Sequence, residues 1–134
     1  MRKSRRRLDN HGVQVTLALN RAELRRYLAR VGDRWHLEGA YLGGTALTGA
    51  TNGPAGEHGD ELPAEFTAVL VAGGFDAVPW LERVHVARAL WDATEMGGHV
   101  RPYCYTRVEF ERQRDTAPAV RDAVWHGLDL LVFI

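Results

Sequence analysis

The sequence predicts a small α/β domain in which a mixed β-sheet is flanked by helices. Apolar, β-branched runs typical of strands alternate along the chain with segments whose apolar residues recur every three or four positions, as in amphipathic helices. Of the 134 residues, 46% are hydrophobic and 25% are charged, the balance of a folded domain. This length accommodates one domain, which we place at residues 20–134, after an N-terminal arm at 1–19.

The arm is strongly basic. Five of its first seven residues are Arg or Lys, so the rest of the chain is net negative although the formal net charge of the whole is +0. Such an arm is either a solvated terminus or a contact for nucleic acid or an acidic partner. The β-branched run at 13–19 predicts a short strand or an ordered arm.

A helix is predicted from Asn20 to Gly32-Asp33, because Asn20 and Glu23 have the spacing of an N-terminal cap. Its apolar face is expected to hold Leu24, Tyr27, Leu28 and Val31. A strand at 36–42 then leads directly into the Gly-Gly-Thr sequence at 43–45. Residues 49–63 form a long loop rich in Gly and Pro, and residues 65–72 form a strand buried on both faces.

One long helix is predicted from about residue 76 to residue 96. Pro79 lies in its first turn, where a missing amide costs little, and Gly97-Gly98 ends it. Its buried stripe is expected to consist of Trp80, Leu81, Val84, Ala87, Leu90, Trp91 and Thr94.

The C-terminal third predicts a strand at 100–105, short helices at 108–114 and 118–126, and a final strand at 128–133. Cys104 is expected to pack within its strand. Most tryptophans are expected in the core, the four being Trp35, Trp80, Trp91 and Trp125.

Several classes of protein are excluded by these patterns. No apolar segment approaches the roughly 20 residues of a membrane span, and no secretory signal pattern follows the basic start. Because the lone Cys104 has no internal disulfide partner, we expect a reducing, cytoplasmic environment. The six histidines lack the close spacing of a zinc site. All but one of the basic residues are arginine, which is typical of a GC-rich bacterial genome.

The glycine-rich turn after the strand at 36–42 is the first candidate site. Gly43, Gly44, Thr45 and Gly49 would present backbone amides where the next helix begins, and amides and helix dipole both favour a phosphate there. Tight turns also explain such sequences, so this motif alone leaves both interpretations open.

The order of motifs resembles the polymerase-beta-type nucleotidyltransferase superfamily, more narrowly the minimal nucleotidyltransferases of bacteria and archaea. The stretch 44–49 is similar to their Gly-Ser-x-x-x-Gly motif, with Thr45 in place of serine. A loop follows, and then a polar-apolar-polar triplet at 65–67 opens a buried strand where the family has Asp-x-Asp. The resemblance covers residues 20–134 and implies a nucleotidyltransferase-like domain that binds ATP with Mg²⁺.

The catalytic positions depart from the family pattern. The resemblance places the aspartate pair at Glu65 and Thr67 and the third aspartate at Arg101. In the family these carboxylates hold divalent metal ions during nucleotidyl transfer. Arg101 instead brings a permanent positive charge, which at ~4 Å and an effective dielectric of ~20 repels a unit charge by about 4 kcal/mol. A register one residue later, at Phe66 and Ala68, would remove Glu65 as well. The fold is therefore expected without its conventional two-metal site.

Three functions stay open at this point. The first is a degenerate nucleotidyltransferase-fold protein that binds a nucleotide or a protein partner. Small family members pair with helical HEPN-type proteins in toxin–antitoxin modules, so the resemblance implies an antitoxin-like role, and a homo-oligomer is also open. The second is an active enzyme that transfers a nucleoside monophosphate from ATP to a protein, RNA or small molecule, with Asp60 or Glu61 joining Glu65 at an unusual Mg²⁺ site. The third is a regulator that contacts DNA through the basic arm.

Overall fold

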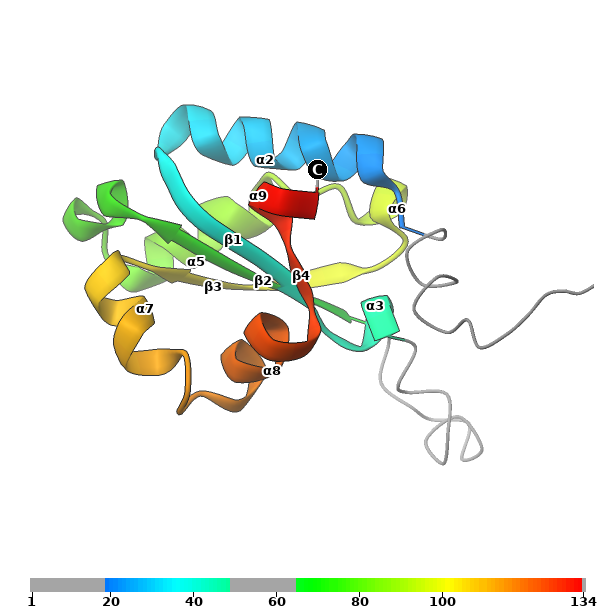
Figure 1. The fold of residues 1–134 in the computed structure, drawn as a ribbon. Coiled ribbons are helices and arrows are strands. Elements are labelled where there is room, and N and C mark those ends of the chain that lie inside the picture. Colours follow the sequence, from blue (N-terminus) through cyan, green and yellow to red (C-terminus); the bar gives the residue numbers. More distant parts are fainter. Residues whose placement is uncertain (1–18, 49–64, 134) are drawn as a thin grey trace, which may run out of the picture.

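The computed structural model describes residues 19–48 and 65–133 (Figure 1). Within them, a four-stranded mixed sheet is covered by helices on both faces, which confirms the predicted mixed α/β class. The predicted short strand at 13–19, except for Leu19, and the loop at 49–63 lie outside the described residues. The same holds for Gly49, Asp60 and Glu61, which belong to the candidate site predicted above.

The sheet has the strand order β3-β2-β1-β4. Strands β1 (Leu37–Gly43) and β2 (Glu65–Ala72) are antiparallel, and β3 (His99–Tyr105) lies parallel to β2. The short β4 (Leu128–Asp129) pairs antiparallel with the end of β1. From Ala68 to Ala72 every residue of β2 is buried, as its apolar sequence predicts for a strand covered on both faces.

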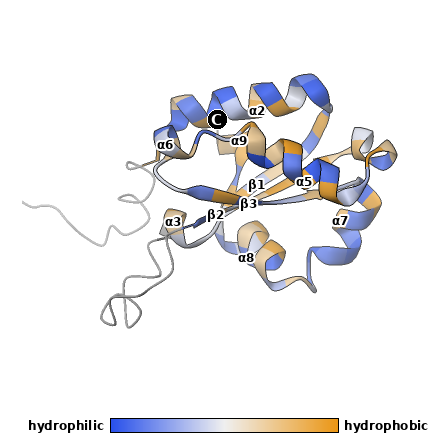
Figure 2. Cartoon of the chain, turned by 180° about the vertical axis from the view of Figure 1, so that it is seen from behind, coloured by the Kyte–Doolittle hydropathy of each residue, from blue (hydrophilic) through white to orange (hydrophobic). Residues whose placement is uncertain are grey.

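Two helical layers sandwich the sheet (Figure 1). One contains α2 (Arg21–Arg34), α5 (Trp80–Ala89), α6 (Ala93–Met96) and α9 (Leu130–Phe133); the other contains α7 (Arg107–Gln113) and α8 (Pro118–His126). The short α3 (Thr45–Thr48) and the 3-10 turn η2 (Gly73–Ala77) follow β1 and β2. Hydrophobic and hydrophilic residues alternate around α2, as in a helix with one buried side (Figure 2). No helix among the described residues is long and apolar enough to cross a membrane.

The start of α2 follows the prediction. The Asn20 side chain accepts a hydrogen bond from the Glu23 amide at 3.0 Å, and three of the four predicted face residues are fully buried: Leu24, Tyr27 and Val31. The helix continues through Gly32-Asp33 and ends at Arg34, one residue beyond the expected end. A mid-helix glycine costs only about 1 kcal/mol. Burial of Val31 and Trp35 on the last turn offsets this cost.

The long helix predicted at 76–96 is wrong: two shorter helices, α5 and α6, replace it. The chain leaves α5 after Ala89, and Asp92 begins α6 by accepting a hydrogen bond from the Glu95 amide at 3.0 Å. Only part of the predicted stripe is buried. Ala87 and Trp91 lie in the core, whereas Leu81 is 78% exposed because the inner face of α5 uses Arg83 instead.

The C-terminal segment also departs from the prediction. Helices α7 and α8 lie where expected, but the predicted strand at 128–133 pairs over two residues and then becomes α9. The Asp129 carboxylate accepts a hydrogen bond from the Leu131 amide at 3.2 Å, which turns the chain into that helix. Trp80 and Trp125 are exposed, so only Trp35 and Trp91 occupy the expected core positions.

Candidate functional site

The described residues of the predicted site converge on one end of the sheet. Thr67 pairs with Gly43 on β1 and with Arg101 on β3, while Glu65 begins β2 opposite His99. Side chains of directly paired residues lie on the same face of a sheet. Gly43 packs against Ala123, whose Cα would lie 3.0 Å from an added Cβ. Gly43, Thr67 and Arg101 therefore share the face that α8 covers.

The Gly-Gly-Thr turn is packed against the start of β2. Gly44 has φ +100°, and a Cβ there would lie 2.4 Å from the Glu65 carbonyl oxygen and 2.7 Å from the Thr67 nitrogen. The Thr45 hydroxyl oxygen accepts a hydrogen bond from the Glu65 amide at 3.1 Å. These contacts give Gly44 and Thr45 a structural role in joining β1, α3 and β2. Phosphate binding at this turn stays a prediction.

An ion pair links two of the three positions that the resemblance predicts to be catalytic. The Arg101 Nε donates to the Glu65 carboxylate at 3.3 Å, with both side chains well exposed. An exposed pair of this kind contributes at most about 1 kcal/mol to stability. Its importance is chemical, because the guanidinium of Arg101 engages the one carboxylate among the three positions.

The donor set does not fit a divalent metal ion. Magnesium prefers several oxygen ligands, usually with carboxylates among them. Glu65, Thr67 and Arg101 supply one carboxylate, one neutral hydroxyl and one permanent cation. Across residues 19–48 and 65–133, no three His, Cys, Asp or Glu side chains lie together so as to hold a metal ion. Glu65 alone is therefore a poor metal site, and Asp60, its predicted helper, lies outside the described ranges.

A pocket of about 280 Å³ adjoins Glu65. It is lined by residues from the starts of β2 and β3, the end of α5, the segment between α5 and α6, and the start of α6: Glu65, Arg88, Trp91, Ala93, His99 and Val100. No motif in the sequence points to Arg88 or His99 as site residues. His99 lies beside Glu65 through the parallel register of β2 and β3, which spacing along the chain does not reveal.

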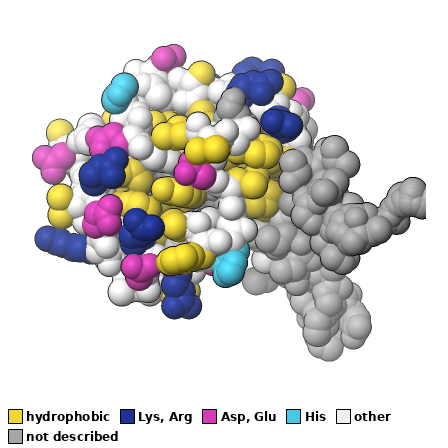
Figure 3. Space-filling view, viewed as in Figure 1, with side chains coloured by type: hydrophobic (Ala, Val, Ile, Leu, Met, Phe, Trp, Pro, Cys, Tyr) yellow, Lys and Arg dark blue, Asp and Glu magenta, His cyan; other side chains and the backbone are white. Residues whose placement is uncertain are grey.

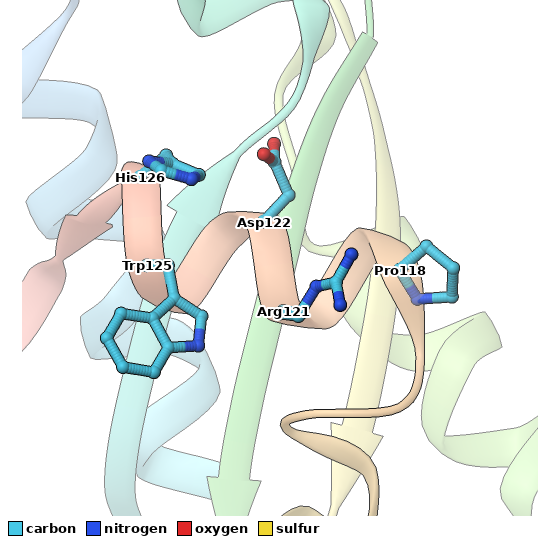
Figure 4. Close-up of a pocket in the computed structure, with 5 residues that line it drawn as sticks. All are labelled: Pro118, Arg121, Asp122, Trp125 and His126. Atoms are coloured by element: carbon cyan, nitrogen blue, oxygen red, sulfur yellow. The ribbon is translucent and has the colours of Figure 1, made fainter.

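A second, larger hollow of about 390 Å³ lies along α8. Its lining residues repeat at helical spacing on one side of this helix: Pro118, Arg121, Asp122, Trp125 and His126 (Figure 4). Asp122 and His126 project toward one edge of α8, whereas Trp125 projects toward the other. Trp125 is 63% exposed, so α8 carries an aromatic ring on the surface of the described part of the chain.

Further apolar side chains are exposed on the face that carries α9 and β4. Figure 3, in the same view as Figure 1, shows hydrophobic side chains gathered across the middle of this face. Leu131 and Val132 of α9 are 51% and 82% exposed. Gathered apolar side chains on a surface are typical of contact with another macromolecule.

The buried charged groups have structural partners. Glu23 pairs with Arg30 at 2.5 Å and Arg26 at 2.9 Å, and its hydrogen bond to Arg30 is the main cause that holds the pKa of this carboxyl below its usual range. Arg83 donates to the Cys104 carbonyl at 3.1 Å and to Glu109 at 2.8 Å, and this second bond lowers the pKa of Glu109. The pairs of Glu23 lie within α2, whereas Arg83 joins α5 to β3 and α7, and both sets lie apart from the candidate site.

Cys104 is a packing residue, as its sequence context predicts. It is fully buried in β3, and burial raises the pKa of its thiol to about 12. A thiol in this environment holds its proton at neutral pH and is a poor nucleophile.

Comparison of the chain with protein-family models, with curated proteins and with solved structures finds no match. The resemblance to nucleotidyltransferases therefore stays a prediction from the motifs of the sequence.

Proposed function

We propose that this protein has a nucleotidyltransferase-like fold and acts by binding a nucleotide or a protein partner rather than by nucleotidyl transfer. The observation that carries the proposal is the ion pair between Arg101 and Glu65. A cation occupies the neighbourhood in which a nucleotidyltransferase would need carboxylates for its metal ions.

The arrangement of the chain supports the fold part of the proposal. A glycine turn and short helix follow β1, the next strand is antiparallel to it, and the third strand is parallel to the second. Positions 65, 67 and 101 are thereby neighbours, as the resemblance requires of residues that share one site. Gly44 and Thr45 contact the same end of β2.

The charges support binding over transfer. A metal ion held by Glu65 would lie close to the Arg101 guanidinium, which is 3.3 Å from that carboxylate. The guanidinium repels such an ion, although water screens the repulsion because both side chains are well exposed. The same guanidinium suits a phosphate oxygen, because arginine pairs with phosphate through a planar fork of donors.

Two kinds of ligand fit this proposal. A nucleotide would use the turn at Gly43–Thr45 together with Arg101 and would need no Mg²⁺. A protein partner, such as the HEPN-type helical partner that an antitoxin-like role implies, would use the exposed apolar residues on α9 or Trp125 on α8. A partner that covers these residues would gain apolar contact area.

An active nucleotidyltransferase is the second candidate, because Glu65 keeps one carboxylate at 39% exposure beside the glycine turn. That reaction would require Mg²⁺, ATP and a further carboxylate such as Asp60.

Calorimetric titration of ATP separates the candidates. Binding of ATP in EDTA with an affinity equal to that of Mg-ATP, and its loss in Arg101→Gln, would support nucleotide binding without transfer. Strict Mg²⁺ dependence together with release of pyrophosphate that Glu65→Gln abolishes would support the enzyme and overturn the proposal. Absence of binding in both conditions would leave the protein-partner form, which a search for co-purifying helical proteins tests.

A further inference from the structure

The pocket beside Glu65 contains an arginine that pairs with none of the described residues. The Arg88 side chain, at the end of α5, makes no ion pair or hydrogen bond with any residue that the structure describes. It lines the same hollow as His99, whose ring likewise contacts no charged partner in the described ranges. A neutral imidazole keeps one N–H donor, so both side chains can donate to a ligand at neutral pH.

The balance of charge in this pocket favours an anion. Glu65, the one acidic residue among the described residues of the lining, is already paired with Arg101 at 3.3 Å. The nearby Asp92 uses a carboxylate oxygen to accept the Glu95 amide at the start of α6. Arg88 is therefore the charged lining residue that no described residue neutralises. Arginine suits a phosphate better than lysine does, because its planar guanidinium can donate two parallel hydrogen bonds to phosphate oxygens.

The wall formed by Trp91 limits what can enter. This indole is only 8% exposed, its Nε1 donates to the Gly98 carbonyl at 2.9 Å, and its ring packs against Phe66 and Tyr27. It is a rigid apolar wall and offers no free face on which a base would stack. The volume of about 280 Å³ lies just below the range of pockets that enclose drug-sized ligands.

We propose that this pocket binds the phosphate group of a small phosphorylated ligand, with Arg88 and His99 as its donors. Arg101 contributes indirectly by neutralising Glu65. The inference goes beyond the proposed function and does not rest on it, because neither the glycine turn nor a nucleoside is needed. A free phosphate and the phosphate of a nucleotide share this chemistry.

The experiment is a calorimetric titration of inorganic pyrophosphate in EDTA at low salt, with parallel titrations of AMP and adenosine. Backbone amide spectra recorded during the titration locate the site. We expect binding at about 1 mM or tighter, shifts at Ala93, His99 and Val100, and no binding of adenosine. AMP that binds more tightly than pyrophosphate would identify a nucleotide as the source of the phosphate, and the reverse order would identify a free phosphate.

Arg88→Gln should weaken pyrophosphate binding about tenfold, and His99→Gln should weaken it less. Arg112→Gln is the matched control, since Arg112 is an exposed arginine on α7, in the other layer. Circular dichroism checks that each variant is folded. Absence of pyrophosphate binding, or equal weakening by the Arg88 and Arg112 substitutions, would overturn the inference. If ATP fails to bind while pyrophosphate binds in an Arg88-dependent manner, the inference stands and the nucleotide form of the proposed function fails.

Discussion

Substitution of Gly44 by alanine tests the close packing of the glycine turn against β2. The added Cβ would lie 2.4 Å from the Glu65 carbonyl oxygen and 2.7 Å from the Thr67 nitrogen, and both are backbone atoms that cannot rotate away. The residue also has φ +100°, a conformation that side chains rarely adopt. The conformation costs about 1–2 kcal/mol and the overlap about 1–3 kcal/mol more, so we expect a loss of about 2–5 kcal/mol in the free energy of unfolding.

Gly97→Ala provides the matched control. Gly97 has φ +81°, but a Cβ there would meet no atom within 4 Å. This substitution should therefore cost only the conformational part, about 1–2 kcal/mol. Urea unfolding of both variants, followed by tryptophan fluorescence, measures the two losses. Equal losses, or a Gly44→Ala protein as stable as the parent, would refute the packing of the turn against β2.

Three further predictions concern buried and site groups. Because the pKa of Glu23 is lowered in the folded protein, its ionised carboxylate stabilises the fold at pH values above the pKa of the unfolded chain. This stabilisation is lost as the pH falls through the lower pKa of the folded protein. Glu23→Gln should therefore lower the free energy of unfolding by about 2 kcal/mol at pH 7, and by less when unfolding is measured at acidic pH. Cys104, with its pKa raised to about 12, should react with a thiol reagent only after unfolding in urea. The double substitution Thr67→Asp, Arg101→Asp removes the repelling cation and adds two carboxylates beside Glu65, and it should create Mg²⁺ binding that calorimetry detects.

Each of these expectations has a result that would contradict it. A Glu23→Gln protein whose stability difference is the same at pH 3 and pH 7 would refute the role of its ionised form. Rapid labelling of Cys104 in the native protein would contradict its burial. Failure of the folded double variant to bind Mg²⁺ would contradict the assignment of positions 65, 67 and 101 to the metal-binding positions of the family.

Local signals in the sequence predict much of this fold. The Asn20 cap and the spacing of Leu24, Tyr27 and Val31 locate α2, and the apolar run at 65–72 locates the most buried strand. The helix cap and the apolar spacing involve only residues close together in the chain, so one sequence is enough to predict both segments. The same is true of α8, which begins at Pro118 as expected for a proline in the first turn.

Other elements depend on contacts that no local pattern reveals. The helix predicted at 76–96 is interrupted because Trp91 turns into the core and donates to Gly98, while Asp92 begins a new helix. The expected last strand becomes a helix after Asp129 because β4 pairs with β1 at only Tyr41 and Leu42. Arg83 could not be placed in the core from periodicity, since its burial requires Glu109 and the Cys104 carbonyl as partners.

The candidate site likewise has features that the sequence predicts and features that it does not. The motif resemblance brought positions 65, 67 and 101 into one hypothesis, and the pairing of β2 with β3 places Thr67 beside Arg101. The ion pair between Arg101 and Glu65 depends on side-chain geometry across β2 and β3, and the pocket with Arg88 depends in addition on α5 and α6. Spacing along the chain carries no signal for either.

The central claim is that Arg101 stands where the resemblance places a metal-binding aspartate, so that any nucleotide binding is independent of Mg²⁺. The most direct test is calorimetric titration of ATP into the parent protein and into Arg101→Gln, each with Mg²⁺ and with EDTA. We predict equal affinities in the two conditions for the parent and a loss of about tenfold on removal of the guanidinium. Binding that requires Mg²⁺ and is unaffected by Arg101→Gln would contradict the claim.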